Sequence, residues 1–288
     1  MFSKTLSKKL IFQVIAIVAI LALPSLLYSG SYIIADAPAP KEGVEMPPEN
    51  QEQLSEGLLF IVLDGGRRDM MKNPELMPNL NSITANNGTY LSVYTNPLTM
   101  TASCVKEMAT GIPSRPNEGL SNFHPEHPGT PDGWSLASSY DGDEDGIADN
   151  EFAIVGDYVW GDLYADNDDI NFMRHRHGHA DYMQGDTESF ETLNSWLDGE
   201  IPASNTKEDT IFERAPNVIV AHLSGLDSTG HRYGSKDSTE YKDKLKWLDD
   251  NFAIIFEKVR LKYSNWTVVV TSDHGLTDTG QHGSPDPI

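Results

Sequence analysis

The stretch LLFIVLD at residues 58–64 decides the fold of this chain, because six apolar residues run without interruption into an aspartate. A short aliphatic run of this kind is typical of a strand buried on both faces of a parallel sheet. Two similar runs follow, NVIVAHL at 217–223 and WTVVVTS at 266–272. Since patterns with helical spacing separate the runs, the sequence predicts an α/β domain with a mostly parallel central sheet and helices on both faces.

Apolar spacing and residues typical of helix ends predict the remaining elements. A helix that begins near Thr101 should end at Thr110, because Gly111 follows it. Asp186 is expected to open another helix, since apolar residues at helical spacing come after it. Further helices are expected over 77–86 and 241–263, and a further strand over 152–155.

The chain is acidic and has one cysteine. Its 288 residues include 43 acidic and 21 basic side chains, which give a formal net charge of −22. Such a charge repels nucleic acid phosphates, so we exclude nucleic acid as a partner. Because Cys104 is the single cysteine, no intrachain disulfide can form, and the core and bound metals must supply the stability.

The N-terminal stretch predicts a membrane anchor. Residues 10–28 carry no charge and follow three lysines. About 20 apolar residues can span a bilayer, and a basic flank favours a cytoplasmic N-terminus. We therefore expect residues 1–30 to be an uncleaved signal anchor, with the remainder facing the lumen or the exterior. A cleaved signal peptide is the alternative.

Two further regions follow the expected anchor. Residues 31–56 are rich in Pro, Glu, Ala and Gln and are expected to form a linker. Residues 57–288 should form the catalytic domain. Only six residues follow His282, without a closing helix or strand, so we expect this domain to continue beyond Ile288.

Side chains of the types that bind metals follow each of the three predicted strands. The carboxyl ends of parallel strands meet at one edge of a sheet, where α/β proteins hold their ligands. Asp and His suit zinc, and manganese where more of the ligand atoms are oxygens. The sequence thus predicts a site for two divalent metal ions, which points to phosphoryl-transfer or hydrolytic chemistry. The candidate ligands are Asp64, Asp227, His231, Asp273, His274 and His282.

A nucleophile is expected at the start of the helix over 101–110. Thr99, Thr101 and Ser103 each offer a hydroxyl there, beside backbone N–H groups that favour negative charge. The structural alternative is a Thr or Ser N-cap with no catalytic role. Cys104 is interpreted as a small core residue, since the residues after it do not follow the Cys-x-Pro-x-Arg pattern of a sulfatase.

An acidic segment after residue 140 has the spacing of a calcium loop and resembles thrombospondin type 3 and EF-hand-like loops. Its candidate ligands are Asp141, Asp143, Asp145, Asp149 and Glu151. Gly146 stands at the sixth position, where a sharp turn is needed, but Phe152 takes the twelfth position, where an acid is expected. A plain acidic surface loop is the alternative.

Four motifs together carry a resemblance to a known family. They are DGGRRD at 64–69, TMTASCVKEMATG at 99–111, GLDSTGH at 225–231 and SDHGLTDTGQHG at 272–283. The chain resembles the type I phosphodiesterase/nucleotide pyrophosphatase branch of the alkaline phosphatase superfamily. Within that branch it is most similar to the glycosylphosphatidylinositol (GPI) ethanolamine phosphate transferases. The resemblance extends over residues 57–283 and implies an alkaline phosphatase-like fold.

The resemblance also implies residue roles. It selects Thr101 as the nucleophile and places a phosphate-binding asparagine at Asn122. Arg67 and Asp69 would form a structural ion pair. One metal would be held by Asp227, His231 and His282, and the other by Asp64, Asp273, His274 and the Thr101 oxygen.

The activity implied by the resemblance is transfer of phosphoethanolamine from phosphatidylethanolamine to a GPI-type glycolipid, through a phosphothreonine intermediate. The enzyme would sit in the endoplasmic reticulum membrane with its catalytic domain in the lumen. A membrane-anchored or secreted phosphodiesterase, at the cell surface or outside the cell, is the first alternative. A calcium-stabilised surface domain without catalytic activity is the second.

Overall fold

The computed structural model describes residues 55–95, 99–114, 132–142, 147–164, 170, 172–176, 182–199 and 216–282. Its centre is a sheet of five strands in the order β3-β2-β4-β1-β5, and every neighbouring pair is parallel. The strands are β1 (Gly57–Leu63), β2 (Phe152–Asp157), β3 (Phe172–Arg176), β4 (Val218–Leu223) and β5 (Trp266–Thr271). The predicted parallel sheet is thereby confirmed. β1 lies between the other two predicted runs and pairs Leu58 with Val218 of β4 and with Thr267 of β5.

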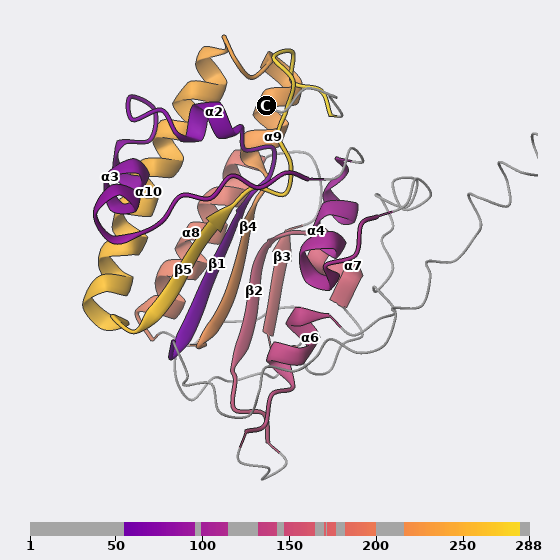
Figure 1. Ribbon diagram of the computed structural model, residues 1–288, viewed down its shortest axis with the longest axis vertical. Coiled ribbons are helices and arrows are strands. Elements are labelled where there is room, and N and C mark those ends of the chain that lie inside the picture. The colour runs from indigo at the N-terminus through magenta and orange to yellow at the C-terminus, as the bar shows by residue number, and fades with distance from the viewer. Residues whose placement is uncertain are drawn as a thin grey trace, which may run out of the picture.

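Helices cover both faces of the sheet, so the domain has three layers (Figure 1). One face carries α3 (Pro78–Asn87), α8 (Tyr182–Leu197) and α10 (Thr239–Lys262), and the other carries α4 (Thr101–Thr110), α6 (Gly133–Ser138) and α7 (Val159–Tyr164). Two further helices, α2 (Arg68–Met71) and α9 (Gly225–Tyr233), lie beyond the carboxyl ends of the strands. The predicted α/β class with helices on both faces is confirmed.

The side chains of β1 alternate between two cores. Leu59 and Ile61 pack with side chains of α8 and α10. Phe60 turns to the opposite face, where its ring centroid lies 5.0 Å from that of Trp134 in α6. Burial of one such side chain contributes about 1.5–3 kcal/mol, so an apolar run without polar interruptions stabilises both layers at once.

Local end chemistry fixes the helices that carry and support the site. α4 ends at Gly111, whose φ of 67° is one that residues with a Cβ rarely adopt. α10 begins after Ser238, whose hydroxyl accepts a hydrogen bond from the Tyr241 backbone N–H at 3.1 Å. Both helices occupy the predicted ranges to within two residues at each end.

The expected start of a helix at Asp186 is wrong. α8 begins at Tyr182, and Asp186 lies inside it as a buried residue. Its carboxylate pairs with the buried ammonium of Lys244 at 2.5 Å and accepts a hydrogen bond from the Gly225 backbone N–H at 3.2 Å. A residue that looked like a local cap therefore makes a tertiary contact instead, and it holds the start of α9 against α10.

Among the residues that the structure describes, no helix is long and apolar enough to cross a membrane. The expected anchor at 1–30 and nearly all of the expected linker at 31–56 lie outside those residues. The anchor therefore stays a prediction.

Candidate functional site

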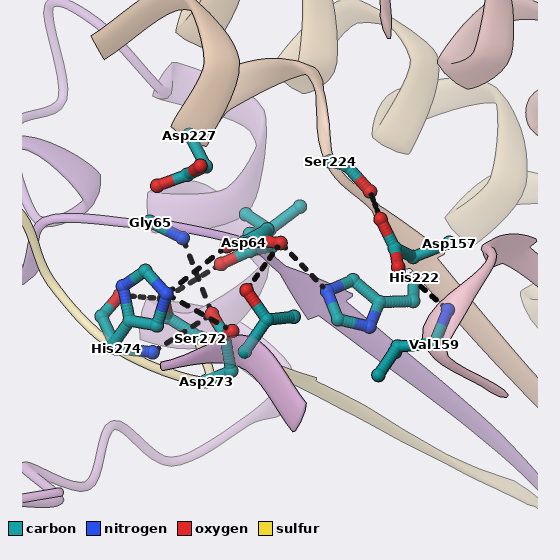
Figure 2. Close-up of polar contacts among 12 residues, drawn as sticks. Asp64, Gly65, Asp157, Val159, His222, Ser224, Asp227, Ser272, Asp273 and His274 are labelled. Atoms are coloured by element: carbon teal, nitrogen blue, oxygen red, sulfur yellow. Dashed lines mark hydrogen bonds and ion pairs between the residues drawn. The ribbon is translucent and has the colours of Figure 1, made fainter. Parts of the chain in front are cut away.

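The candidate metal ligands gather at the carboxyl edge of the sheet, as the strand pattern predicts. Asp64 follows β1, Asp273 and His274 follow β5, and α9 after β4 carries Asp227 (Figure 2). Thr101 is the first residue of α4 and approaches Asp64 from the face that α4 covers. Segments far apart in the sequence are thus brought together because the three strands are parallel neighbours.

The first group of ligands centres on Asp64. Its Oδ1 lies 3.3 Å from His274 Nε2, and the same nitrogen lies 3.3 Å from Asp273 Oδ2. Thr101 Oγ1 donates a long hydrogen bond of 3.5 Å to Asp64 Oδ2. Met100 is the N-cap of α4 and the cap has no side-chain hydrogen bond, so the Thr101 hydroxyl is turned toward the carboxylate and does not cap the helix.

The second group lies beside the first and is more exposed. His231 Nε2 is 3.3 Å from Asp227 Oδ2 and 2.8 Å from His282 Nε2. His282 Nε2 lies 3.9 Å from Asp227 Oδ1. Sequence reasoning assigned His274 to the first group alone, but His274 also joins Asp227 and His282 in a compact set whose ligand atoms lie within 4.8 Å of one another. His274 therefore stands between the two groups.

Several buried atoms of these groups have no hydrogen-bond partner among the residues that the structure describes. They are Asp64 Oδ1, Asp227 Oδ1, Asp273 Oδ2, His274 Nε2 and His282 Nδ1. Buried polar atoms are costly unless they are satisfied, and three carboxylates with interleaved imidazoles form a donor set that suits zinc or manganese. The residues therefore fit divalent cations, with Asp64, Asp273 and His274 as one complete candidate group.

Electrostatics within the metal-free site favour bound protons. Burial and the charge of Asp64 raise the pKa of Asp227 to about 8 and that of Asp273 to about 7. Burial opposes a charge on His274, but Asp273 and Asp64 raise the pKa of its imidazole to about 10. Burial also opposes the charge of Asp64, yet the neighbouring imidazoles of His222 and His274 hold its pKa below the usual range. The site concentrates negative charge that divalent cations would neutralise.

The metal-free protein is expected to lose stability as the pH rises from about 6.5 to about 8. Asp227, Asp273 and His274 have raised pKa values in the folded state, so the folded chain holds protons that the unfolded chain has released in this range. Each such proton contributes a slope of about −1.4 kcal/mol per pH unit. His282, whose pKa burial and neighbouring imidazoles lower to about 4, acts in the opposite sense only below about pH 6.5.

Melting temperatures of the full chain in detergent measure this slope. In chelator the melting temperature should fall between pH 6.5 and pH 8, and saturating zinc should remove most of the fall, because the cations take the place of the protons. A melting temperature that stays level or rises in chelator would contradict the expectation.

Backbone and hydroxyl contacts hold the loop after β1 in place. Gly65 has a φ of 71°, and a Cβ there would stand 2.9 Å from the Asp227 Cα. The Gly65 N–H donates to Asp273 Oδ1 at 3.2 Å, and its carbonyl accepts from the Tyr241 hydroxyl at 2.7 Å. A glycine is therefore required beside Asp64 both for the turn and for the close approach of α9.

Arg67 connects this loop to the segment that leads to His282. Its guanidinium is buried and donates to Asp69, to Asp278 at 2.7 Å and to the Leu276 carbonyl at 3.1 Å. Hydrogen bonds in several directions suit the fixed fork of an arginine. This geometry agrees with the structural role expected of Arg67 and Asp69, because neither residue belongs to the candidate ligand groups.

His222 is a site residue that the sequence reasoning missed. It lies in β4 inside the run NVIVAHL, and its buried Nε2 stands 3.4 Å from Asp64 Oδ2 (Figure 2). Trp160 of α7 donates its indole N–H to His222 Nδ1 at 3.0 Å. The signal available in the sequence was one histidine inside an otherwise apolar strand, which needs a buried partner.

Other predicted site residues lie partly or wholly outside the described residues. Asn122 is outside them, and so are Asp143 and Asp145 of the expected calcium loop. Phe152, at the twelfth position of that loop, is the first residue of β2 and is fully buried. Cys104 is buried as interpreted, and burial raises the pKa of its thiol.

A groove of about 1390 Å³ borders the ligand groups. Thr99, Asp273 and His274 line it where it meets the site, and Val268 and Val270 of β5 line it farther away. The site is therefore reached from a large, partly apolar groove, which gives room for a bulky substrate.

Comparison with known proteins identifies the family. The family model of type I phosphodiesterase / nucleotide pyrophosphatase matches residues 58–285. GPI ethanolamine phosphate transferase 1 of Yarrowia lipolytica is 31% identical over 129 residues, which are 42% of this chain and 14% of the relative. The enzyme of the same name from Saccharomyces cerevisiae is 37% identical over 98 residues, 33% of this chain and 9% of the relative. The match thus spans a small part of these relatives.

Similar solved structures include murine ectonucleotide pyrophosphatase / phosphodiesterase 5, with 15% identity, a TM-score of 0.48 and coverage of 77% of this chain and 57% of that chain. The C-terminal periplasmic domain of EcEptC from Escherichia coli has 13% identity, a TM-score of 0.47 and coverage of 81% and 68%. The family match, by contrast, spans all three strand runs and the ligand-bearing loops that follow them. The chain therefore belongs to the type I phosphodiesterase / nucleotide pyrophosphatase family of enzymes, in the alkaline phosphatase superfamily.

Proposed function

We propose that this protein transfers phosphoethanolamine from a phospholipid to a GPI-type glycolipid, with two divalent metal ions and a covalent intermediate on Thr101. One observation carries the proposal: the Thr101 hydroxyl and two groups of cation ligands converge on Asp64 and its neighbours. The choice of phosphoethanolamine and of a glycolipid acceptor rests on the named activity of the similar transferases. Zinc is the expected metal, and manganese is the alternative.

The residues have separate tasks in the proposed reaction. Asp64, Asp273 and His274 would hold one cation, and Asp227, His282 and His231 the other. When bound, the cations would supply Lewis-acid stabilisation of phosphoryl charge. Asp64 accepts the hydrogen bond of the Thr101 hydroxyl and so orients the nucleophile. The N-terminus of α4 adds a partial positive charge beside the phosphoryl group.

Two in-line displacements follow from a single nucleophile. The Thr101 oxygen attacks phosphorus, a new P–O bond forms, and the bond to the diacylglycerol oxygen breaks. A hydroxyl of the acceptor glycolipid then attacks the phosphothreonine and restores Thr101. We place the reaction at the lumenal face of the endoplasmic reticulum membrane, with residues 1–30 as anchor.

Hydrolysis is the second candidate function, because the matching family model is named for phosphodiesterases. Water would then replace the glycolipid hydroxyl in the second displacement, and the protein would act at the cell surface or outside the cell. Membership of an enzyme family leaves the non-catalytic calcium-stabilised domain without support.

A partition experiment separates the two enzymatic functions. The full chain in mixed micelles receives phosphatidylethanolamine labelled in its ethanolamine and a GPI-type glycolipid with free mannose hydroxyls. Label that moves to the glycolipid supports transfer. Label released as free phosphoethanolamine supports the phosphodiesterase. If the label stays in the phospholipid with zinc or manganese present, the proposed function is wrong.

A further inference from the structure

A buried histidine, His222, lies beside Asp64, and a buried tryptophan, Trp160, contacts this histidine. His222 is 1% exposed and Trp160 is fully buried, between β4 and α7. The indole N–H of Trp160 donates to His222 Nδ1 at 3.0 Å. An imidazole buried in an apolar layer is costly unless both nitrogens have partners.

Trp160 selects the tautomer of His222. An indole nitrogen can only donate, so Nδ1 must present a lone pair to it, and the ring proton must lie on Nε2. Nε2 lies 3.4 Å from Asp64 Oδ2, within ion-pair distance, so its proton stands beside that carboxylate although the two atoms form no hydrogen bond. Figure 2 shows His222 and His274 approaching Asp64 from opposite sides.

A second proton on His222 would have to sit on Nδ1, where the indole N–H already donates. The hydrogen bond from Trp160 therefore favours the neutral ring with its proton on Nε2.

The surroundings keep this pair rigid. β2 passes so close to His222 that a Cβ on Gly156 would collide with the His222 carbonyl oxygen. Asp157, the next residue, accepts hydrogen bonds from the Ser224 hydroxyl and from the Val159 N–H. These contacts fix the start of α7, which carries Trp160, relative to the end of β4.

We propose that His222 is a positioning residue for the metal site: held in one tautomer by Trp160, it fixes Asp64 Oδ2 and leaves Oδ1 directed at His274. The inference rests on the proposed function, because it assigns His222 a task toward a cation at Asp64. Thr101 shares Asp64 Oδ2 with His222, so the same contact also fixes the carboxylate oxygen that orients the nucleophile. Partners of this kind typically set the orientation of metal ligands.

Zinc titration of the full chain in detergent, in competition with a chromophoric chelator, tests the proposal. Wild type should bind two zinc ions. His222→Leu should weaken one of them by about 10–100-fold and leave the other unchanged, since loss of an outer partner typically has this effect. His222→Gln should recover most of the affinity, because its amide N–H can replace Nε2–H. Trp160→Phe should weaken the same ion by about 10-fold.

Matched controls separate positioning from packing. Trp196→Phe makes the same exchange at a fully buried tryptophan of α8, in the other core, and should leave both affinities unchanged. Wild-type affinity in both His222→Leu and Trp160→Phe would overturn the inference, as would equal losses in His222→Gln and His222→Leu. If His222→Leu fails to fold by circular dichroism, the zinc affinity of Trp160→Phe is compared with that of Trp196→Phe. Equal affinities would then overturn the inference. If the wild-type chain binds neither zinc nor manganese, the proposed function itself is wrong.

Discussion

Replacing Thr101 with alanine is expected to abolish turnover, with a loss of about 10³-fold or more, because the covalent intermediate can no longer form. The fold should survive the change. Thr101 is partly exposed, its side chain does not cap α4, and alanine is a strong helix former. Initial rates with labelled phosphatidylethanolamine measure the effect, and a rapid acid quench measures the phosphoprotein.

Thr99→Ala is the matched control for that change. Thr99 has the same side chain two residues earlier and lines the neighbouring groove. We expect Thr99→Ala to keep most of the turnover and the trapped phosphothreonine. Normal turnover in Thr101→Ala, or phosphate trapped on Thr99, would refute the assignment of the nucleophile.

Replacing Asp64 with asparagine is expected to remove one bound cation and to lower turnover by about 10²-fold or more. Among the described residues, Asp64 is the one side chain that contacts His274, His222 and the Thr101 hydroxyl together. The amide keeps the shape but removes the charge and one acceptor, so the cation loses a ligand and Thr101 loses its orientation. Metal content after dialysis and initial rates at saturating zinc measure the two losses.

Asp250→Asn provides the control, because it makes the same chemical change away from the site. Asp250 lies exposed on α10. Its metal content and rate should equal those of wild type. If Asp64→Asn binds two cations as tightly as wild type, Asp64 is not a ligand, and the first ligand group must be revised.

Much of the fold and of the ligand grouping could be predicted because both depend on local pattern. The apolar runs at 58–63, 218–223 and 266–271 are long enough to mark strands. The prediction that all three are buried is wrong for the third, because β5 is an edge strand and only partly buried. Parallel strands deliver the residues that follow them to one edge, so Asp64, Asp227 and Asp273 could be placed together without coordinates.

The remainder could not be predicted, because it depends on partners distant in sequence. Trp160 and His222 are 62 residues apart, and the local sequence around either residue does not predict that the two side chains form a hydrogen bond. Asp186 has a sequence context that favours a helix start, yet its buried pairing with Lys244 decides its position. His274 faces both ligand groups. This sharing depends on the loop after β5, which packs against α9 where Leu276 and Gly280 meet Gly230.

Anomalous diffraction from crystals of the zinc-loaded protein tests the central claim most directly. The account predicts two peaks at the carboxyl edge of the sheet. One should lie about 2.0–2.2 Å from oxygens of Asp64 and Asp273 and from His274 Nε2, and the other at similar distances from Asp227 and His282. No peak at this edge, or peaks elsewhere with Thr101 distant from them, would contradict it.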